Sequence, residues 1–171
     1  QANRSLIARL AHQATIDHLT GVLTRSAFTR RANALLDSRQ QHAQALPLTL
    51  MMLDIDHFKA INDAHGHAIG DQVLRQFART LQDQLHEGEL FARMGGEEFA
   101  LLLSDTPKSG AMTFARALMN LLAAQRLPFA PCLLQKAHIA LAVHAGITGA
   151  AEFTRRDDLA EANGLHPRQN G

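Results

Sequence analysis

Blocks of hydrophobic and polar positions along this chain predict helices and strands in turn. Residues 1–16 have a helical stripe of apolar positions, and residues 26–38 have a second one. A continuous apolar run then extends from Leu48 and ends in Asp54-Ile55-Asp56. A run of this length, bounded by a proline and by carboxylates, predicts a central strand that is buried on both faces.

The second half of the pattern predicts a helix, a hairpin, another helix and a further strand. Asp71 is predicted to be the N-cap of a helix whose apolar stripe ends at Leu85. Two short apolar runs flank Met94-Gly95-Gly96-Glu97, which is the pattern of a β-hairpin with glycines at its tip. We expect the remaining elements to be a helix over 109–125, a strand over 138–147 and a short helix over 157–163.

The predicted helix over 1–16 has two interpretations. It packs on its own domain, or it is a coiled-coil linker, because a heptad-like stripe ahead of a domain is compatible with both. Asp17-His18-Leu19-Thr20-Gly21 then breaks the periodicity with residues that favour turns. We therefore divide the chain into an N-terminal linker or signalling helix over 1–16 and a single domain over 17–171.

Composition limits the possible classes of protein. The chain has 171 residues, which is enough for one domain. Its 17 Lys and Arg residues against 16 Asp and Glu give a net charge of +1, so there is no electrostatic reason to expect a nucleic-acid partner. Cys132 is a single cysteine, which fits a reducing compartment. The chain begins with Gln, and we expect it to be part of a longer protein.

Two acidic groups mark a candidate site. Asp54 ends the predicted buried strand, and Glu97-Glu98 follow the hairpin glycines. If the two strands are neighbours, Asp54 and Glu97 converge, and hard carboxylate oxygens beside substrate phosphates are what Mg²⁺ requires. Gly95 and Gly96 would let a bulky ligand approach the main chain. Each group alone is explained by a capped turn or a hairpin, but the two together favour a site.

The stretch between these groups, residues 58–71, is expected to be compact and turn-rich. The side chains of Asn62 and Asp71 can read the edge of a guanine through its donors and its acceptor, although N-capping is the commoner role of an Asp. Three histidines also raise the possibility of zinc: His57, His65 and His67. Carboxylates dominate this edge and no cysteine is near, so zinc is the weaker hypothesis.

Five blocks of sequence together resemble the diguanylate cyclase family, whose members contain a GGDEF domain. The blocks are Asp17-His18-Leu19-Thr20-Gly21, Asp54 to Asp63, Gly66-His67, Gly70-Asp71 and Arg93 to Phe99. The resemblance as a whole covers roughly residues 17–147 in the family's order and spacing, with Gly-Gly-Glu-Glu-Phe as the variant of the signature motif.

The resemblance implies a fold and an activity. The implied fold is α/β (α+β), a nucleotidyl-cyclase-like sandwich with a central, mostly antiparallel sheet flanked by helices. The implied enzyme is a nucleotidyltransferase that joins two GTP molecules into cyclic di-GMP and releases pyrophosphate, with Mg²⁺, or Mn²⁺ in its place, as cofactor. Because the product has two identical halves, the expected partners are a second copy in a transient homodimer and an upstream sensor domain. The expected location is the cytoplasm, with a membrane tether through an upstream region as an alternative.

The resemblance also implies roles for individual residues. The metal ligands are Asp54, the main-chain carbonyl of Ile55, and Glu97. The catalytic residues are Glu97 and Glu98, which help to deprotonate the attacking 3′-hydroxyl, and Lys59, which adds positive charge near the phosphates. The substrate-binding residues comprise guanine readers, the turn that faces the phosphates, the hairpin glycines and a C-terminal cation: Asn62, His67, Asp71, His57, Phe58, Gly95, Gly96 and Arg168.

Three departures from the family pattern affect what can be carried over. His86 and Glu89 occupy the positions of the family's inhibitory Arg-x-x-Asp motif, although Arg93 matches a second arginine used by some product-inhibited members. His144 replaces the Ser of a late Ser-x-Gly strand. The closing Ala-Asp-x-Ala-Leu-Tyr-x-Ala-Lys helix is altered or truncated, and Arg168 reaches its Lys position in one of two registers.

Two other functions compete with the cyclase prediction. A catalytically weak domain could bind GTP or cyclic di-GMP as a sensor or dimerisation module, and it would tolerate the altered C-terminal end. Another nucleotidyl cyclase of the same fold would prefer adenine, whereas Asn62 and Asp71 favour guanine.

Overall fold

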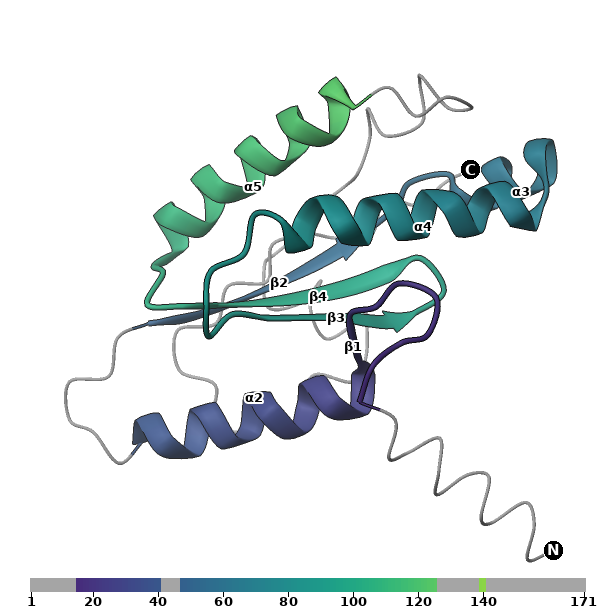
Figure 1. Cartoon of the computed structure of the whole chain (residues 1–171). Helices are drawn as coiled ribbons and strands as arrows, with labels where there is room; N and C mark the ends of the chain where they lie inside the picture. Colours follow the sequence, from purple (N-terminus) through teal and green to yellow (C-terminus); the bar gives the residue numbers. More distant parts are fainter. Residues whose placement is uncertain (1–14, 41–46, 126–138, 141–171) are drawn as a thin grey trace, which may run out of the picture.

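The computed structural model of the chain describes residues 15–40, 47–125 and 139–140 (Figure 1). In chain order the elements are β1 (Leu23–Thr24), α2 (Arg25–Gln40), β2 (Leu48–Asp54), α3 (Phe58–His65), α4 (His67–Gln82), β3 (Leu90–Gly95), β4 (Glu98–Ser104), α5 (Lys108–Ala124) and β5 (Ile139–Ala140). Among these residues, no helix is both long enough and apolar enough to cross a membrane.

The strands form one five-stranded sheet in the order β1-β3-β4-β2-β5. β1 runs parallel to β3, and the other neighbouring strands are antiparallel. β2 pairs with β4 from Leu48 opposite Ser104 to Asp54 opposite Glu98. The prediction that the apolar run forms an internal strand is confirmed, and so is the prediction of a mostly antiparallel sheet flanked by helices.

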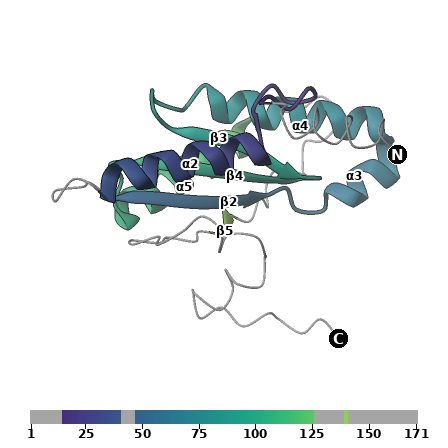
Figure 2. The same ribbon diagram turned by 90° about the horizontal axis from the view of Figure 1, so that it is seen from below.

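Helices cover both faces of the sheet. Figure 1 shows α2 on one face and α4 and α5 on the other, and Figure 2 shows α3 beyond the end of β2. Because side chains alternate along a strand, successive residues of β2 contribute to different core clusters. Leu48 and Leu50 pack in the cluster that contains Ala27 and Phe28 of α2, and Met51 and Leu53 pack in the cluster of α3, α4 and α5.

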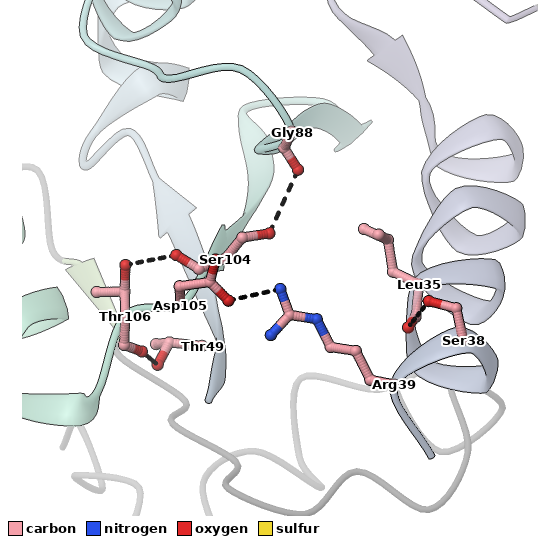
Figure 3. A network of polar contacts seen from close by, with 8 residues as sticks. All are labelled: Leu35, Ser38, Arg39, Thr49, Gly88, Ser104, Asp105 and Thr106. Carbon is pink, nitrogen blue, oxygen red and sulfur yellow. Dashed lines mark hydrogen bonds and ion pairs between the residues drawn. The ribbon is translucent and has the colours of Figure 1, made fainter. Parts of the chain in front are cut away.

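The end of the sheet farthest from Asp54 is closed by polar contacts (Figure 3). Arg39 of α2 forms a 2.7 Å ion pair with Asp105, which follows β4. The Thr49 hydroxyl of β2 donates a hydrogen bond of 2.7 Å to the Thr106 carbonyl. These contacts fix α2, β2 and the connection from β4 to α5 to one another at this end.

Most of the longer elements agree with the sequence prediction. The helix predicted over 26–38 is α2, the predicted hairpin is β3 and β4, and the helix predicted over 109–125 is α5. The strand predicted over 138–147 is described at Ile139–Ala140, where it pairs with β2. The helix predicted over 157–163 lies outside the described residues.

Two predictions about the shorter segments were wrong, and a third falls almost entirely outside the described residues. Asp71 is not an N-cap, because α4 begins at His67 with Gly66 in the N-cap position. The stretch expected to be turn-rich contains α3, which buries Phe58 and Ile61 on one face. At the end of the helix predicted over 1–16, Ile16 forms a β-bridge with Leu23, and residues 1–14 lie outside the described residues.

Candidate active site

The acidic residues of the sequence prediction lie at one end of the sheet. Asp54 is the last residue of β2 and is paired with Glu98, the first residue of β4. Alternation along both strands places these two residues in phase with Met52 and Ala100, on the α2 side of the sheet. Glu97 precedes Glu98 in the β3–β4 turn, and β2 and β4, the strands beside which the two acidic groups lie, are neighbours. Asp54, Glu97 and Glu98 are all partly exposed.

The chain leaves β2 through a turn that is anchored in the core. Ile55 is 1% exposed, which fixes the peptide that follows Asp54. The Ile55 carbonyl accepts a 3.3 Å hydrogen bond from the Phe58 amide, which closes the turn at the start of α3. His57 has a φ of 58°, a left-handed conformation that non-glycine residues rarely adopt. This conformation changes the direction of the chain just before α3 begins.

The nucleotide-binding residues predicted between the two acidic groups lie on α3 and at the start of α4. Lys59 is exposed in the first turn of α3, and Asn62 is half-buried one turn later. His67 is the exposed first residue of α4, and Asp71 is half-buried in its second turn. Both Figure 1 and Figure 2 show α3 at the end of the sheet where β2 finishes. The fold therefore brings this segment to the same end as the carboxylates.

The hairpin that carries Glu97 is irregular at its tip. The pairing of β3 with β4 shifts between Arg93 and Gly95, and Gly95 then lies opposite Glu98. Gly96 has a φ of 48°, a left-handed conformation that glycine adopts without steric cost. Gly95 and Gly96 are exposed, so the main chain at the tip is accessible from the surface.

Arg93 fixes the hairpin tip to the N-terminal turn. Its Nε donates a hydrogen bond of 2.9 Å to the Gly96 carbonyl, and its Nη1 lies 3.3 Å from Oδ1 of Asp17. The same Asp17 oxygen accepts hydrogen bonds from the Thr20 amide at 3.0 Å and from the Thr20 hydroxyl at 2.6 Å. One carboxylate oxygen thus connects a turn near residue 17 to the hairpin.

These contacts lower the pKa of the Asp17 carboxyl below its ordinary value. Partial burial acts in the opposite direction and raises the pKa, because it disfavours the charged form. The hydrogen bonds from Thr20 and the charge and hydrogen bond of Arg93 together outweigh burial. The ionised form of Asp17 is therefore the form that the fold stabilises.

The ion pair between Arg93 and Asp17 was not predicted from the sequence. Asp17 and Thr20 have the spacing at which an Asp accepts hydrogen bonds from a residue three positions later, so the local turn had a recognisable signal. Arg93 had no such signal, because its partner Asp17 is 76 positions away in the sequence.

The loop between α4 and β3 contains the two residues that replace the inhibitory motif. Glu89 accepts a hydrogen bond of 2.8 Å from the His86 amide and lies 3.8 Å from His86 Nδ1. The His86 side chain is 86% exposed, whereas that of Glu89 is 9% exposed. Glu89 therefore stabilises its own loop. Arg168 of the predicted substrate-binding set lies outside the described residues.

The chain is similar in sequence to a known protein family over most of its length. Residues 14–163 match the family model described as diguanylate cyclase, GGDEF domain. Diguanylate cyclase TpbB of Pseudomonas aeruginosa is 40% identical over 121 residues, which are 71% of this chain and 27% of that protein. The chain thus spans well under two thirds of that relative's length.

Solved structures are similar over most of the chain. A sensory box/GGDEF family protein from Caulobacter crescentus has a TM-score of 0.68 and 30% identity, covering 89% of this chain and 94% of that chain. The GGDEF domain of DgcB from the same organism, solved in complex with cyclic di-GMP, has a TM-score of 0.64 and 30% identity, covering 74% of this chain and 72% of that chain.

Proposed function

Since the chain belongs to the diguanylate cyclase family and contains its GGDEF domain, we propose that it joins two GTP molecules into cyclic di-GMP. The observation that carries the proposal is the pairing of Asp54 with Glu98, which sets Glu97 in the adjacent turn at the end of the sheet where α3 lies. Relatives that are named diguanylate cyclases support it.

A divalent metal fits the donor groups at this edge. Asp54, Glu97 and the Ile55 carbonyl would hold it, and all three are hard oxygen donors, which favours Mg²⁺ first and Mn²⁺ second. Across the described ranges, no three His, Cys, Asp or Glu side chains cluster in a way that could hold a metal. The coordination would therefore be completed by phosphate oxygens and water, as is usual for Mg²⁺. When bound, such an ion lowers the pKa of a hydroxyl and neutralises phosphate charge.

The guanine base of GTP would be recognised at the corner between α3 and α4. Asn62 offers an amide donor and a carbonyl acceptor, and Asp71 offers two carboxylate acceptors for the N1–H and N2–H₂ groups of guanine. Both are half-buried, which restricts their rotamers and strengthens each hydrogen bond relative to an exposed one. His67, exposed at the start of α4, would lie near the same nucleoside.

The remaining residues would bind phosphate and move the proton. The turn of His57 and Phe58 and the ammonium of Lys59 face the phosphates, with Arg168 as a second cation. The 3′-oxygen of one GTP attacks the α-phosphorus of the other, the bond from that phosphorus to the bridging oxygen of the pyrophosphate breaks, and Glu97, assisted by Glu98, takes the hydroxyl proton. The 3′-oxygen of the second nucleotide then attacks the α-phosphorus of the first, which releases the second pyrophosphate and closes the ring.

One domain with one GTP supplies half of this reaction, so two copies must meet face to face. We infer a transient homodimer in the cytoplasm, where GTP is available, and an upstream sensor domain that sets the encounter. Because the closing segment departs from the family pattern, the loss of one charge-assisted phosphate contact would cost about 1.5–3 kcal/mol, and the activity is expected to be low.

The proposed role of Glu97 is tested by measuring cyclic dinucleotide formed from GTP and Mg²⁺. Glu97→Gln keeps the size of the side chain but removes the base and the charge, and we expect the rate to fall by about 10²-fold or more. Glu87→Gln is the matched control, because Glu87 is exposed in the loop before β3, and its rate should equal that of the wild type.

Two results would contradict the proposal. A Glu97→Gln variant as active as Glu87→Gln would remove Glu97 from the mechanism. GTP that binds to the wild type without forming any cyclic dinucleotide would support a binding module in place of an enzyme.

A further inference from the structure

Gly70 lies in the first turn of α4 and is packed against side chains of α3. A Cβ atom placed on Gly70 would overlap Oδ1 of Asn62 and would lie 3.0 Å from Cγ of Asn62 and 3.2 Å from Cζ of Phe58. Carbon and oxygen atoms do not approach this closely without moving, so one of the two helices or the Asn62 side chain would have to shift. The space beside Asn62 therefore depends on the absence of a side chain at Gly70.

The position of Asn62 explains why the contact is so close. Phe58 and Asn62 are four residues apart on α3, so their side chains lie on the same face of that helix. Phe58 is 9% exposed and belongs to the core cluster that α4 also lines. Burial of Phe58 holds this face of α3 against α4, and the Asn62 amide is carried to Gly70 with it.

The backbone provides no alternative reason for a glycine at this position. Gly70 lies inside α4 and is not one of the positive-φ glycines. Alanine is favoured over glycine in the interior of a helix, so the sequence has a residue that weakens α4 locally. Lack of space beside Asn62 is the physical reason that the structure gives.

We propose that Gly70, the residue before Asp71, is a positioning residue for guanine recognition, because it leaves room for the Asn62 amide. The inference rests on the proposed function, in which these two side chains read the base. A methyl group at position 70 would displace the Asn62 amide from this place, and its donor and acceptor would no longer meet the guanine edge. Adenine, which lacks the guanine O6 and N2–H₂ groups, would lose no such contact.

The inference is tested by the ratio of dissociation constants for GTP and ATP in the presence of Mg²⁺. Both nucleotides carry the same triphosphate, and the ratio does not depend on how much of the protein is folded. We expect Asn62→Ala and Gly70→Ala each to reduce the preference for GTP about tenfold, which corresponds to the loss of one hydrogen bond. Gly110→Ala is the matched control, because Gly110 lies in the first turn of α5 at the other end of β4, and it should keep the wild-type ratio.

A second readout follows the steric contact itself and needs no nucleotide. Because alanine is favoured over glycine inside a helix, Gly70→Ala should raise the urea midpoint of unfolding in the Asn62→Ala background. In the wild type the new methyl group meets the Asn62 side chain, so the same change should raise the midpoint less or lower it. The double variant also keeps the test available if Gly70→Ala alone does not fold.

The outcomes separate this inference from the proposed function. If Asn62→Ala loses the preference for GTP and Gly70→Ala keeps it, the inference is wrong and the proposed function stands. An equal effect of Gly70→Ala on the urea midpoint in both backgrounds would also overturn it, because the contact would then not involve Asn62. If the wild type shows no preference for GTP, both proposals fail.

Discussion

At the scale of single residues, Arg93 and Asp17 form the contact that connects the N-terminal turn to the candidate site. Their side chains are 17% and 19% exposed, so the ion pair is screened less than a surface pair. Asp17 also accepts two hydrogen bonds from Thr20, and Arg93 also holds the Gly96 carbonyl at the hairpin tip. Neutralising Asp17 should therefore weaken the turn and the hairpin together.

This contact predicts how stability depends on pH. Because the pKa of Asp17 is lowered in the folded protein, its contribution is fully present above the unfolded pKa of about 3.9 and is lost as the pH falls through the folded value. At pH 7, Asp17→Asn should lower the free energy of unfolding by about 1–2 kcal/mol, as for a hydrogen-bonded charge. The measurement is urea denaturation of both proteins from pH 7 to pH 3.

The difference between the two proteins should shrink toward the acid end of this range. Asp83→Asn makes the same chemical change at an exposed carboxylate after α4 and serves as the control. A difference between wild type and Asp17→Asn that is constant from pH 7 to pH 3 would show that ionised Asp17 does not stabilise the fold.

At the scale of elements, the hairpin of β3 and β4 joins the site to the core. Phe99 follows Glu98 directly and is completely buried. Its ring centroid lies 4.9 Å from that of Phe77 on α4 and 5.5 Å from that of Phe91 on β3. The position of Glu98 and of the turn before it is therefore set by aromatic packing one residue away.

Truncation of Phe99 tests this dependence. Phe99→Ala should lower the free energy of unfolding by about 3–5 kcal/mol, because it leaves a cavity between β3, β4 and α4. Met112→Ala, a truncation of a partly exposed apolar side chain on α5, should cost about 1 kcal/mol or less. Equal unfolding midpoints of these two variants in a denaturant titration would contradict the packing described here.

The longer elements could be predicted because their signals are local. The apolar run of β2 and the periodic stripe of α4 reflect burial, and burial repeats along each element. The prediction failed where distant contacts decide the local structure. The helix α3 forms because Phe58 and Ile61 are buried against α4 and the sheet, and this also moves the start of α4 from Asp71 back to His67.

The candidate site follows the same rule. The approach of the two acidic groups could be predicted only on the condition that their strands are neighbours, and β2 and β4 are neighbours with Asp54 opposite Glu98. The contact of Arg93 with Asp17 and that of Gly70 with Asn62 could not, since each depends on two segments that meet only in the folded chain. Both contacts position site residues rather than supply chemistry.

At the scale of the whole molecule, the two ends of the sheet carry different groups of residues. One end is closed by the ion pair of Arg39 with Asp105 and the hydrogen bond from Thr49. The other end carries Asp54, Glu98 and the exposed glycines of the β3–β4 turn. The candidate site thus lies at the end of the sheet opposite these polar contacts.

The most direct test of the account is the stoichiometry of the reaction. Purified protein at high concentration is incubated with GTP and Mg²⁺, and cyclic di-GMP and pyrophosphate are quantified by ion-pair chromatography and a pyrophosphate assay. We expect two pyrophosphates to be released for each cyclic di-GMP formed, at a rate per molecule of protein that rises with protein concentration. GDP and inorganic phosphate as the products, or GTP bound and left unchanged, would contradict it.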